Sequence, residues 1–239
     1  MMIAIEYRKL KSTGFVPAFL TGGILAALIP VINTAARPDT FTALSGPTLK
    51  ILLNANSQMI LLLQMILIVC GACIMYHTEY ADRALSHMLA LPLNPEQIYF
   101  GKAAILVMAF FPLLILEGLG LTFCAAHWFS IPEDFYLELL KYSGTMALLG
   151  APTILFMLMV SSWCENMWIS LGIGVLFLST VTVLTGGPFP LKLVPFLTPF
   201  AGLEAAGSSL THLLIGAAAE TAALIILAFP AARIRRYTL

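Results

Sequence analysis

The sequence predicts an all-α integral membrane protein with six transmembrane helices. Hydrophobic residues make up 60% of the 239 residues and charged residues only 10%, with a mean hydropathy of +0.95, which leaves too little polar surface for a soluble protein. Six apolar runs of about 19 to 26 residues can each cross a hydrocarbon core of roughly 30 Å. They lack the period-two alternation of a membrane β-barrel, so we expect helices.

The six expected spans form one transmembrane domain over residues 1–239. They are Phe15–Thr34, Ile51–Tyr76, Ala103–Trp128, Leu139–Ser162, Trp168–Gly186 and Thr211–Ala231. The first run is longer than the apolar region of a signal peptide and has no convincing cleavage pattern, so we expect it to be retained as a span.

Lysine and arginine predict the orientation of these spans. With both termini in the cytoplasm, eight basic residues lie inside and four outside, the asymmetry that the positive-inside rule favours. The inner residues are Arg8, Lys9, Lys11, Arg83, Lys102, Arg233, Arg235 and Arg236, and the outer ones are Arg37, Lys50, Lys141 and Lys192. The net charge is zero, so no basic field points to a nucleic-acid partner.

Residues 1–14 precede the first span and carry a weak amphipathic pattern. Ile3, Tyr7 and Leu10 recur at helical spacing, with charged residues between them. The segment is either an interfacial helix on the cytoplasmic surface or a positive flank that sets topology.

Residues 77–102 separate the second and third spans and are predicted to contain a short amphipathic helix that ends before Pro92. Its apolar ridge is formed by Ala81, Leu85, Met88 and Leu89, and its polar positions are Glu79, Asp82, Arg83 and His87. Such a helix could fill a groove on another protein. It could also rest on lipid headgroups.

Residues 187–210 lie between the fifth and sixth spans on the expected outer side. The segment is apolar but contains Pro188, Pro190, Pro195 and Pro199, too many for a continuous helix. We expect a re-entrant element, because irregular backbone at membrane depth must pack on protein or line a water-filled space. The alternative is a loop on the headgroups.

Three polar side chains fall inside the spans: Gln64, Glu117 and Glu220. Counted from the outer span ends, Glu117 and Glu220 lie on the order of 15 Å deep, and Gln64 lies near the same depth. A carboxylate there costs several kcal/mol unless it is paired, protonated or hydrated, so both acids are functional candidates. They could equally be protonated structural residues that bridge helices.

The sequence contains no motif for chemistry of its own. It has no nucleotide-binding GxxxxGK[ST] loop, no HExxH zinc helix and no GxSxG elbow. The four cysteines, Cys70 and Cys73 among them, are expected to be packing residues, because no second pair or histidine cluster accompanies them. We therefore expect no catalytic residue, no metal site and no cofactor in this chain.

Two segments resemble the ABC-2 type permease family. They are residues 6–12, which read E-Y-R-K-L-K-S, and the stretch from Glu79 through Pro92 to Lys102. The resemblance implies a permease subunit whose loop after the second span is a coupling helix. It implies two ATP-binding subunits that bind ATP and magnesium, and a second permease, identical or homologous.

Residues 90–102 read A-L-P-L-N-P-x-Q-I-Y-x-x-K, which is similar to the lantibiotic (bacteriocin) immunity permeases. That similarity implies a bacterial cell-membrane exporter that removes antimicrobial peptides from the membrane. Two other functions remain open from the residues: an ion-gradient transporter with Glu117 and Glu220 as a proton relay, and a non-transporting assembly or signalling subunit.

Overall fold

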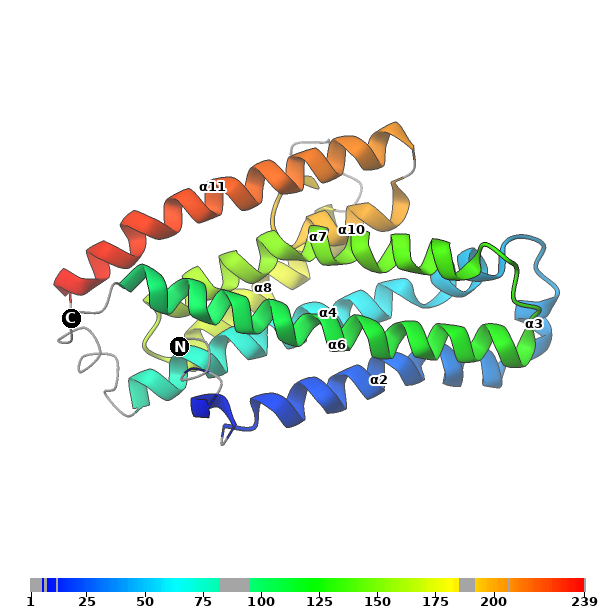
Figure 1. Ribbon diagram of the computed structural model, residues 1–239, viewed down its shortest axis with the longest axis horizontal. Coiled ribbons are helices and arrows are strands. Elements are labelled where there is room, and N and C mark those ends of the chain that lie inside the picture. The colour runs from blue at the N-terminus through cyan, green and yellow to red at the C-terminus, as the bar shows by residue number, and fades with distance from the viewer. Residues whose placement is uncertain are drawn as a thin grey trace.

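The protein is an elongated bundle of helices in a computed structural model that describes residues 6, 8–11, 13–81, 95–184, 192–205 and 207–238. The described part contains no strand. The long helices run along the same axis, and α2 begins in the half of the bundle in which α11 finishes (Figure 1). The helices are α2 (Phe15–Ala36), α3 (Pro38–Thr42), α4 (Thr48–Ala81), α6 (Pro95–Trp128), α7 (Phe135–Trp163), α8 (Met167–Leu184), α10 (Leu197–Glu204) and α11 (Ser208–Thr238).

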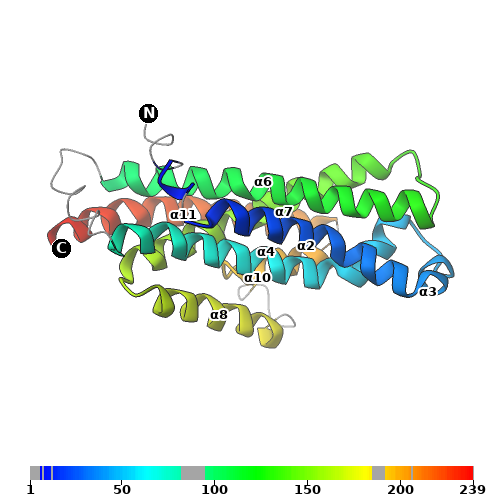
Figure 2. The ribbon, with the colours of Figure 1, turned by 90° about the horizontal axis from the view of Figure 1, so that it is seen from below.

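Among the described residues, five helices are long and apolar enough to cross a membrane: α2, α4, α6, α7 and α11. The expected fifth span, Trp168–Gly186, corresponds to α8, whose apolar stretch Met167–Val181 is shorter. Figure 2 shows α8 along the outside of the bundle. The helical class and the multi-pass character are confirmed, whereas the count of six spans is not.

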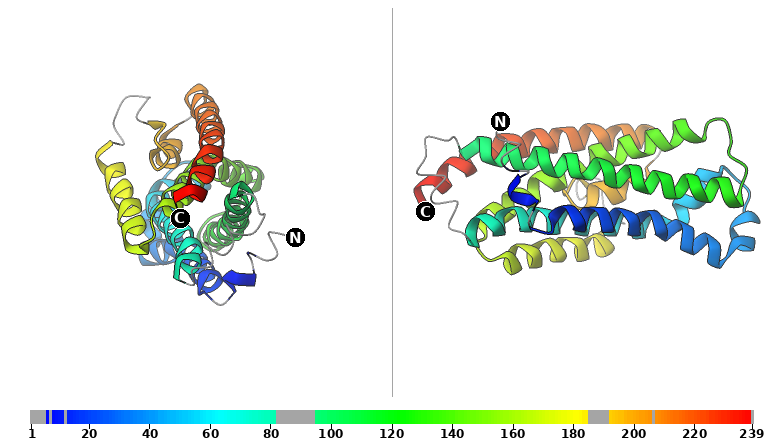
Figure 3. Two further views of the ribbon diagram at one scale, coloured as in Figure 1. Left: turned by 90° about the vertical axis from the view of Figure 1, so that its left-hand side faces the viewer. Right: turned by 60° about the horizontal axis from the view of Figure 1, so that its bottom comes forward.

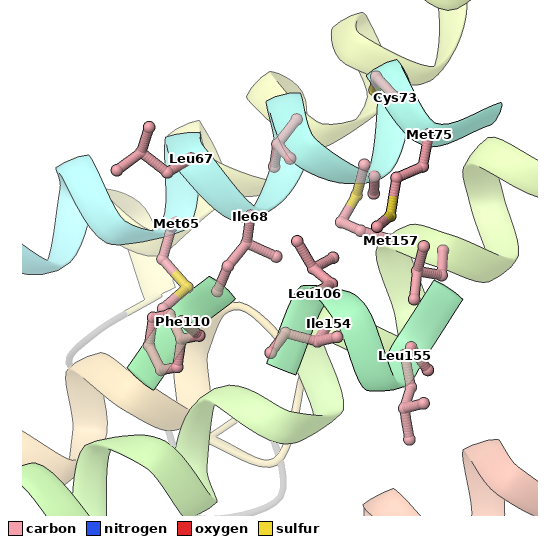
Figure 4. Packing of buried hydrophobic residues seen from close by; sticks show 14 of the residues in the cluster. Met65, Leu67, Ile68, Cys73, Met75, Leu106, Phe110, Ile154, Leu155 and Met157 are labelled. Atoms are coloured by element: carbon pink, nitrogen blue, oxygen red, sulfur yellow. The ribbon is translucent and has the colours of Figure 1, made fainter. Parts of the chain in front are cut away.

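Helix α4 lies at the centre of the bundle and is the most deeply buried of the five spans. It contacts α2, α6, α7 and α8, while α8 and α11 lie at the periphery in the end-on view of Figure 3. Met65 and Ile68 of α4 pack against Leu106 and Phe110 of α6 and against Ile154 of α7 (Figure 4). All five side chains are at most 2% exposed, so these three helices form one continuous core.

The helices around the predicted coupling loop are longer than the sequence suggested. Within the expected loop 77–102, α4 continues through Ala81 and α6 already begins at Pro95. Proline is favoured at the first helical position because its φ angle suits a helix, and Glu96 in the first turn complements the helix dipole. Only residues 82–94 separate the two helices, and they lie outside the described residues.

Helix α10 is a short buried helix within the segment predicted to be re-entrant. Phe196, Leu197 and Phe200 are at most 4% exposed and belong to the main core, and α10 contacts α7, α11, α4 and α8. Phe196 also stacks on Phe177 of α8. The segment therefore packs on protein rather than lying free on a surface. Residues 187–191 lie outside the described residues, and entry of this segment from the outer side remains a prediction.

The N-terminal segment packs against the bundle. Glu6 and Leu10 are each 2% exposed, whereas Arg8 and Lys11 are exposed. The segment thus contributes to the core on one face, while Ile3 and Tyr7 of the expected amphipathic pattern lie outside the described residues.

Helices α2 and α6 form the most extensive helix pair, and a glycine permits their closest approach. A Cβ atom added at Gly120 of α6 would lie 2.8 Å from the Cα atom of Ala27 in α2. Because two backbones meet there, neither side can yield by changing a rotamer. Small residues commonly allow such contact between membrane helices.

We predict that Gly120→Ala lowers the stability of the protein by about 1–3 kcal/mol, since overpacking forces the two helices apart. Thermal unfolding of the purified protein in detergent measures the effect. Gly118→Ala on the same helix is the matched control, because its nearest neighbour would be Leu139 Cδ2 at 3.6 Å, an ordinary contact. Equal melting temperatures for the two variants would contradict the close approach.

Candidate functional site

Four charged side chains meet at the end of the bundle where the loop 82–94 begins and ends. Glu6 and Lys9 come from the N-terminal segment, Glu79 from the last turn of α4, and Lys102 from the second turn of α6. We call these four residues the charged cluster. It contains two cations and two carboxylates, so it carries no net formal charge.

Lys102 is the centre of the charged cluster. Its Nζ atom lies 2.9 Å from Glu6 Oε2, 3.0 Å from Glu79 Oε1 and 3.0 Å from the carbonyl oxygen of Met75. An ammonium group has three N–H donors, so three oxygens match its full capacity. The Tyr76 ring lies 5.1 Å from the same nitrogen and adds a cation–π contact.

Burial makes this arrangement unusual. The side chains of Lys102, Glu6 and Glu79 are 2%, 3% and 2% exposed, and lysine and glutamate are almost never fully buried unless they are paired. Lys9 is 34% exposed and closes the cluster at 2.9 Å from Glu6 and 3.5 Å from Glu79. Glu79 Oε2 is buried and has no hydrogen-bond partner.

The cluster stabilises the ionised forms of its N-terminal members. Burial by itself raises the pKa of Glu6, but Lys102 and Lys9 outweigh it and hold the pKa below the ordinary value of 4.5. Burial lowers the pKa of Lys9, yet Glu6 and Glu79 leave it above 10.5. Glu6 therefore contributes stability above pH 4.5 that is lost as pH falls through its lowered pKa, and Lys9 contributes stability below pH 10.5 that is lost as pH rises through its raised pKa.

The charged cluster brackets the predicted coupling helix. Glu79 lies two residues before the end of α4, and Lys102 is the eighth residue of α6. Their ion pair therefore ties together the two helices that the loop connects. Of the residues predicted to contact a partner, Glu79 is buried inside the chain, and its partner contact remains a prediction. The others, Asp82, Arg83, Leu85, Met88 and Leu89, lie outside the described residues.

A second polar site lies at the middle of the bundle. Gln64 of α4 donates a hydrogen bond from Nε2 to Glu117 Oε2 of α6, and Glu117 is 1% exposed. Tyr142 of α7 is a close neighbour of the carboxyl group. Gln64 Oε1, Glu117 Oε1 and the Tyr142 hydroxyl are buried without a hydrogen bond of acceptable geometry. This site has unused hydrogen-bonding capacity for water or a proton.

Glu220 of α11 lies apart from this pair. Its Oε2 atom lies 3.4 Å from the hydroxyl of Thr198 in α10, which donates the hydrogen bond. The structure thus brings Gln64 and Glu117 together but gives Glu220 a different partner. Whether either acid acts in transport remains a prediction.

Sequence reasoning did not find the pairing of the charged cluster. Glu6 and Lys102 both belong to the segments that carry the family resemblance, but 96 positions separate them. The available signal was that Lys102 directly precedes one expected span and Glu6 lies nine residues before another. Long-range contacts of this kind depend on how the helices pack, which periodicity does not reveal.

The chain matches a known protein family. The family model described as ABC-2 family transporter protein matches residues 2–181, a range that includes the whole charged cluster as well as Gln64 and Glu117. No curated protein and no solved structure matches the chain.

We predict that Lys102→Met destabilises the protein by about 3–5 kcal/mol, because two buried carboxylates lose their shared cation. Thermal unfolding in detergent measures the loss. Lys11→Met removes an exposed cation of the N-terminal segment and is expected to change stability by less than about 0.5 kcal/mol. Adding Glu79→Gln to Lys102→Met should restore part of the stability, since one unpaired charge is removed. A double variant no more stable than Lys102→Met would contradict the proposed energetics.

Proposed function

Because the chain belongs to the ABC-2 transporter family, we propose that it is the permease subunit of an ATP-driven exporter. Five membrane-length helices and the family match over residues 2–181 support a multi-pass transporter subunit. The sequence carries no nucleotide-binding motif, so ATP and magnesium would be bound by a partner ATPase. The observation that carries the proposal is the charged cluster at both ends of loop 82–94.

The proposed coupling mechanism follows from that placement. A partner that binds residues 82–94 would displace the end of α4 at Ala81 and the start of α6 at Pro95. Since Glu79 and Lys102 form an ion pair, the two helix ends would respond together rather than separately. Glu6 bonds the same lysine, which would pass the motion to the segment before α2.

We assign the predicted amphipathic helix the role of filling a groove on the ATPase. Leu85, Met88 and Leu89 would supply the apolar contact, while Asp82 and Arg83 would fix its register. Glu79 would anchor the helix through the charged cluster. In this proposal two ATPase subunits serve two permeases, which are identical or homologous.

The proposed cargo is a lantibiotic-like antimicrobial peptide or another amphipathic compound in a bacterial cell membrane. Its support is the similarity of residues 90–102 to immunity permeases. We further propose six spans, with α8 as the fifth, a re-entrant α10 segment entered from outside, and cytoplasmic termini. The burial of Phe196 and Leu197 and the distribution of lysine and arginine support this topology.

Replacing Leu85 and Met88 together by Asp should abolish ATP-driven export, because charged side chains cannot fill an apolar groove. Export activity and ATPase copurification measure the effect in cells that express the partner subunit. His87→Asp, on the polar face of the same predicted helix, is the matched control and should retain activity. Normal export by the double variant, with normal membrane insertion of both proteins, would refute the coupling role.

The second candidate function is an ion-gradient transporter, and the buried Gln64–Glu117 pair is the observation that favours it. Glu117 is 1% exposed and its neighbours Gln64 and Tyr142 carry no charge, so a proton could compensate its charge. However, Glu220 contacts Thr198 rather than this pair. A proton relay that uses both acids would therefore need further groups between Glu117 and Glu220, because the described residues show no contact between them.

If ATP drives export, Glu117→Gln should keep transport within about twofold of wild type, because glutamine retains the shape and the hydrogen bond to Gln64 while about one hydrogen bond is altered. Transport should also continue after a protonophore collapses the proton gradient. Glu133→Gln, an exposed acid, is the control. Loss of transport in Glu117→Gln together with protonophore sensitivity would favour the gradient-driven function instead.

A further inference from the structure

A cavity of about 320 Å³ opens at the end of the bundle opposite the charged cluster. It lies between the first turns of α4, the first turns of α7, and the connection from α10 to α11. In the predicted topology this is the outer end. We call it the outer cavity, and its polar lining consists of Lys50, Asn54, Ser57, Lys141, Tyr142 and Thr145.

The outer cavity carries two lysines without compensating charge. Lys50 and Lys141 are both exposed, and none of the ion pairs formed among the described residues includes either of them. Glu133, Asp134 and Glu138 lie at the same end, but none of these carboxylates is within ion-pair distance of the two lysines. No described side chain that lines the cavity is acidic.

The position of Lys50 at the start of α4 also favours the binding of an anion in the outer cavity. It is the third residue of α4, whose first turn contains no acidic residue. The N-terminus of a helix carries a partial positive charge, so a cation there is disfavoured and an anion is stabilised. Two of the four basic residues expected outside thus line one cavity, and the N-terminus of α4 adds to their positive potential.

The cavity changes from charged to apolar along its length. Ser57 lies two turns beyond Lys50, roughly 10 Å deeper along the helix, and it is 6% exposed. Met146 of α7, which is 2% exposed, also lines the cavity. Together with Leu203 and Leu210 it forms the apolar wall of the cavity. A ligand that fits has an anionic head and an apolar chain, with head and chain separated as in a phospholipid.

We propose that the outer cavity binds an anionic phospholipid of the adjacent leaflet, with its phosphate at Lys50 and Lys141 and an acyl chain against Met146, Leu203 and Leu210. Lys50 is the third residue of α4 and Lys141 the seventh of α7, so in the predicted topology both lie toward the outer headgroups. The proposal does not depend on ATP-driven export, since the lipid can bind whether or not the subunit transports anything.

The test is native mass spectrometry of the full chain from nanodiscs that contain equal amounts of phosphatidylglycerol and phosphatidylcholine with the same acyl chains. Wild type should retain phosphatidylglycerol preferentially. Each lysine is expected to contribute on the order of fivefold, as basic residues do near anionic membrane surfaces. The variant with Lys50→Gln and Lys141→Gln should therefore lose the preference, and the variant with Arg at both positions should keep it.

The matched control carries Arg37→Gln and Lys192→Gln, which removes the other two outer cations. Neither residue lines the cavity, so its lipid preference should equal that of wild type. An unchanged preference in the Lys50 and Lys141 variant, or an equal loss in the control, would overturn the assignment. If millimolar inorganic phosphate displaced the lipid, the site would bind the phosphate group without needing the acyl chain, and the lipid assignment would be overturned.

Discussion

The buried ammonium group of Lys102 is the interaction on which the cytoplasmic end of this bundle depends in the predicted topology. Its three oxygen neighbours come from Glu6, Glu79 and the backbone of Met75, at 2.9 to 3.0 Å. Placing a lysine at 2% exposure costs several kcal/mol of desolvation unless its charge is balanced and its donors are satisfied. The cluster meets both conditions, and in doing so it fixes three chain segments relative to one another.

The rest of the structure follows from the requirement that backbone groups in lipid be hydrogen-bonded internally. Helices satisfy that requirement, and the packing of α4 against α6 and α7 then decides where polar groups can lie. Gln64 and Glu117 face each other across the α4–α6 contact, which removes both from lipid. The bundle thus has an ionic contact at the helix ends and an amide–carboxyl contact at mid-depth.

Much of this fold could be predicted from the sequence because long apolar runs identify spans directly. The expected runs from Phe15 and up to Trp128 agree with α2 and α6 at those ends. Hydropathy could not locate the other ends, since α4 and α6 extend beyond their apolar centres into residues such as Glu79 and Lys102. Those polar residues are buried in helices and paired with each other, and pairing is a property of the packed helices.

The candidate sites show the same division between residues that the sequence identifies and contacts that it does not. Glu117 and Gln64 could be identified singly, because a polar side chain inside an apolar run is conspicuous. Their hydrogen bond depends on how α4 and α6 are rotated about their own axes, as does the contact of Glu220 with Thr198. These helices are only weakly amphipathic, so the sequence does not predict which face of each helix is buried.

The saturation of Lys102 also constrains how motion could pass through the charged cluster. With all three donors used, Glu79 cannot move away from Glu6 unless Lys102 gives up one of its oxygens. The carboxylate left behind would then be buried without its cation, which is strongly unfavourable. Displacement of the end of α4 is therefore opposed unless α6 and the N-terminal segment move with it. In the proposed coupling mechanism, force on loop 82–94 would therefore move these three segments together.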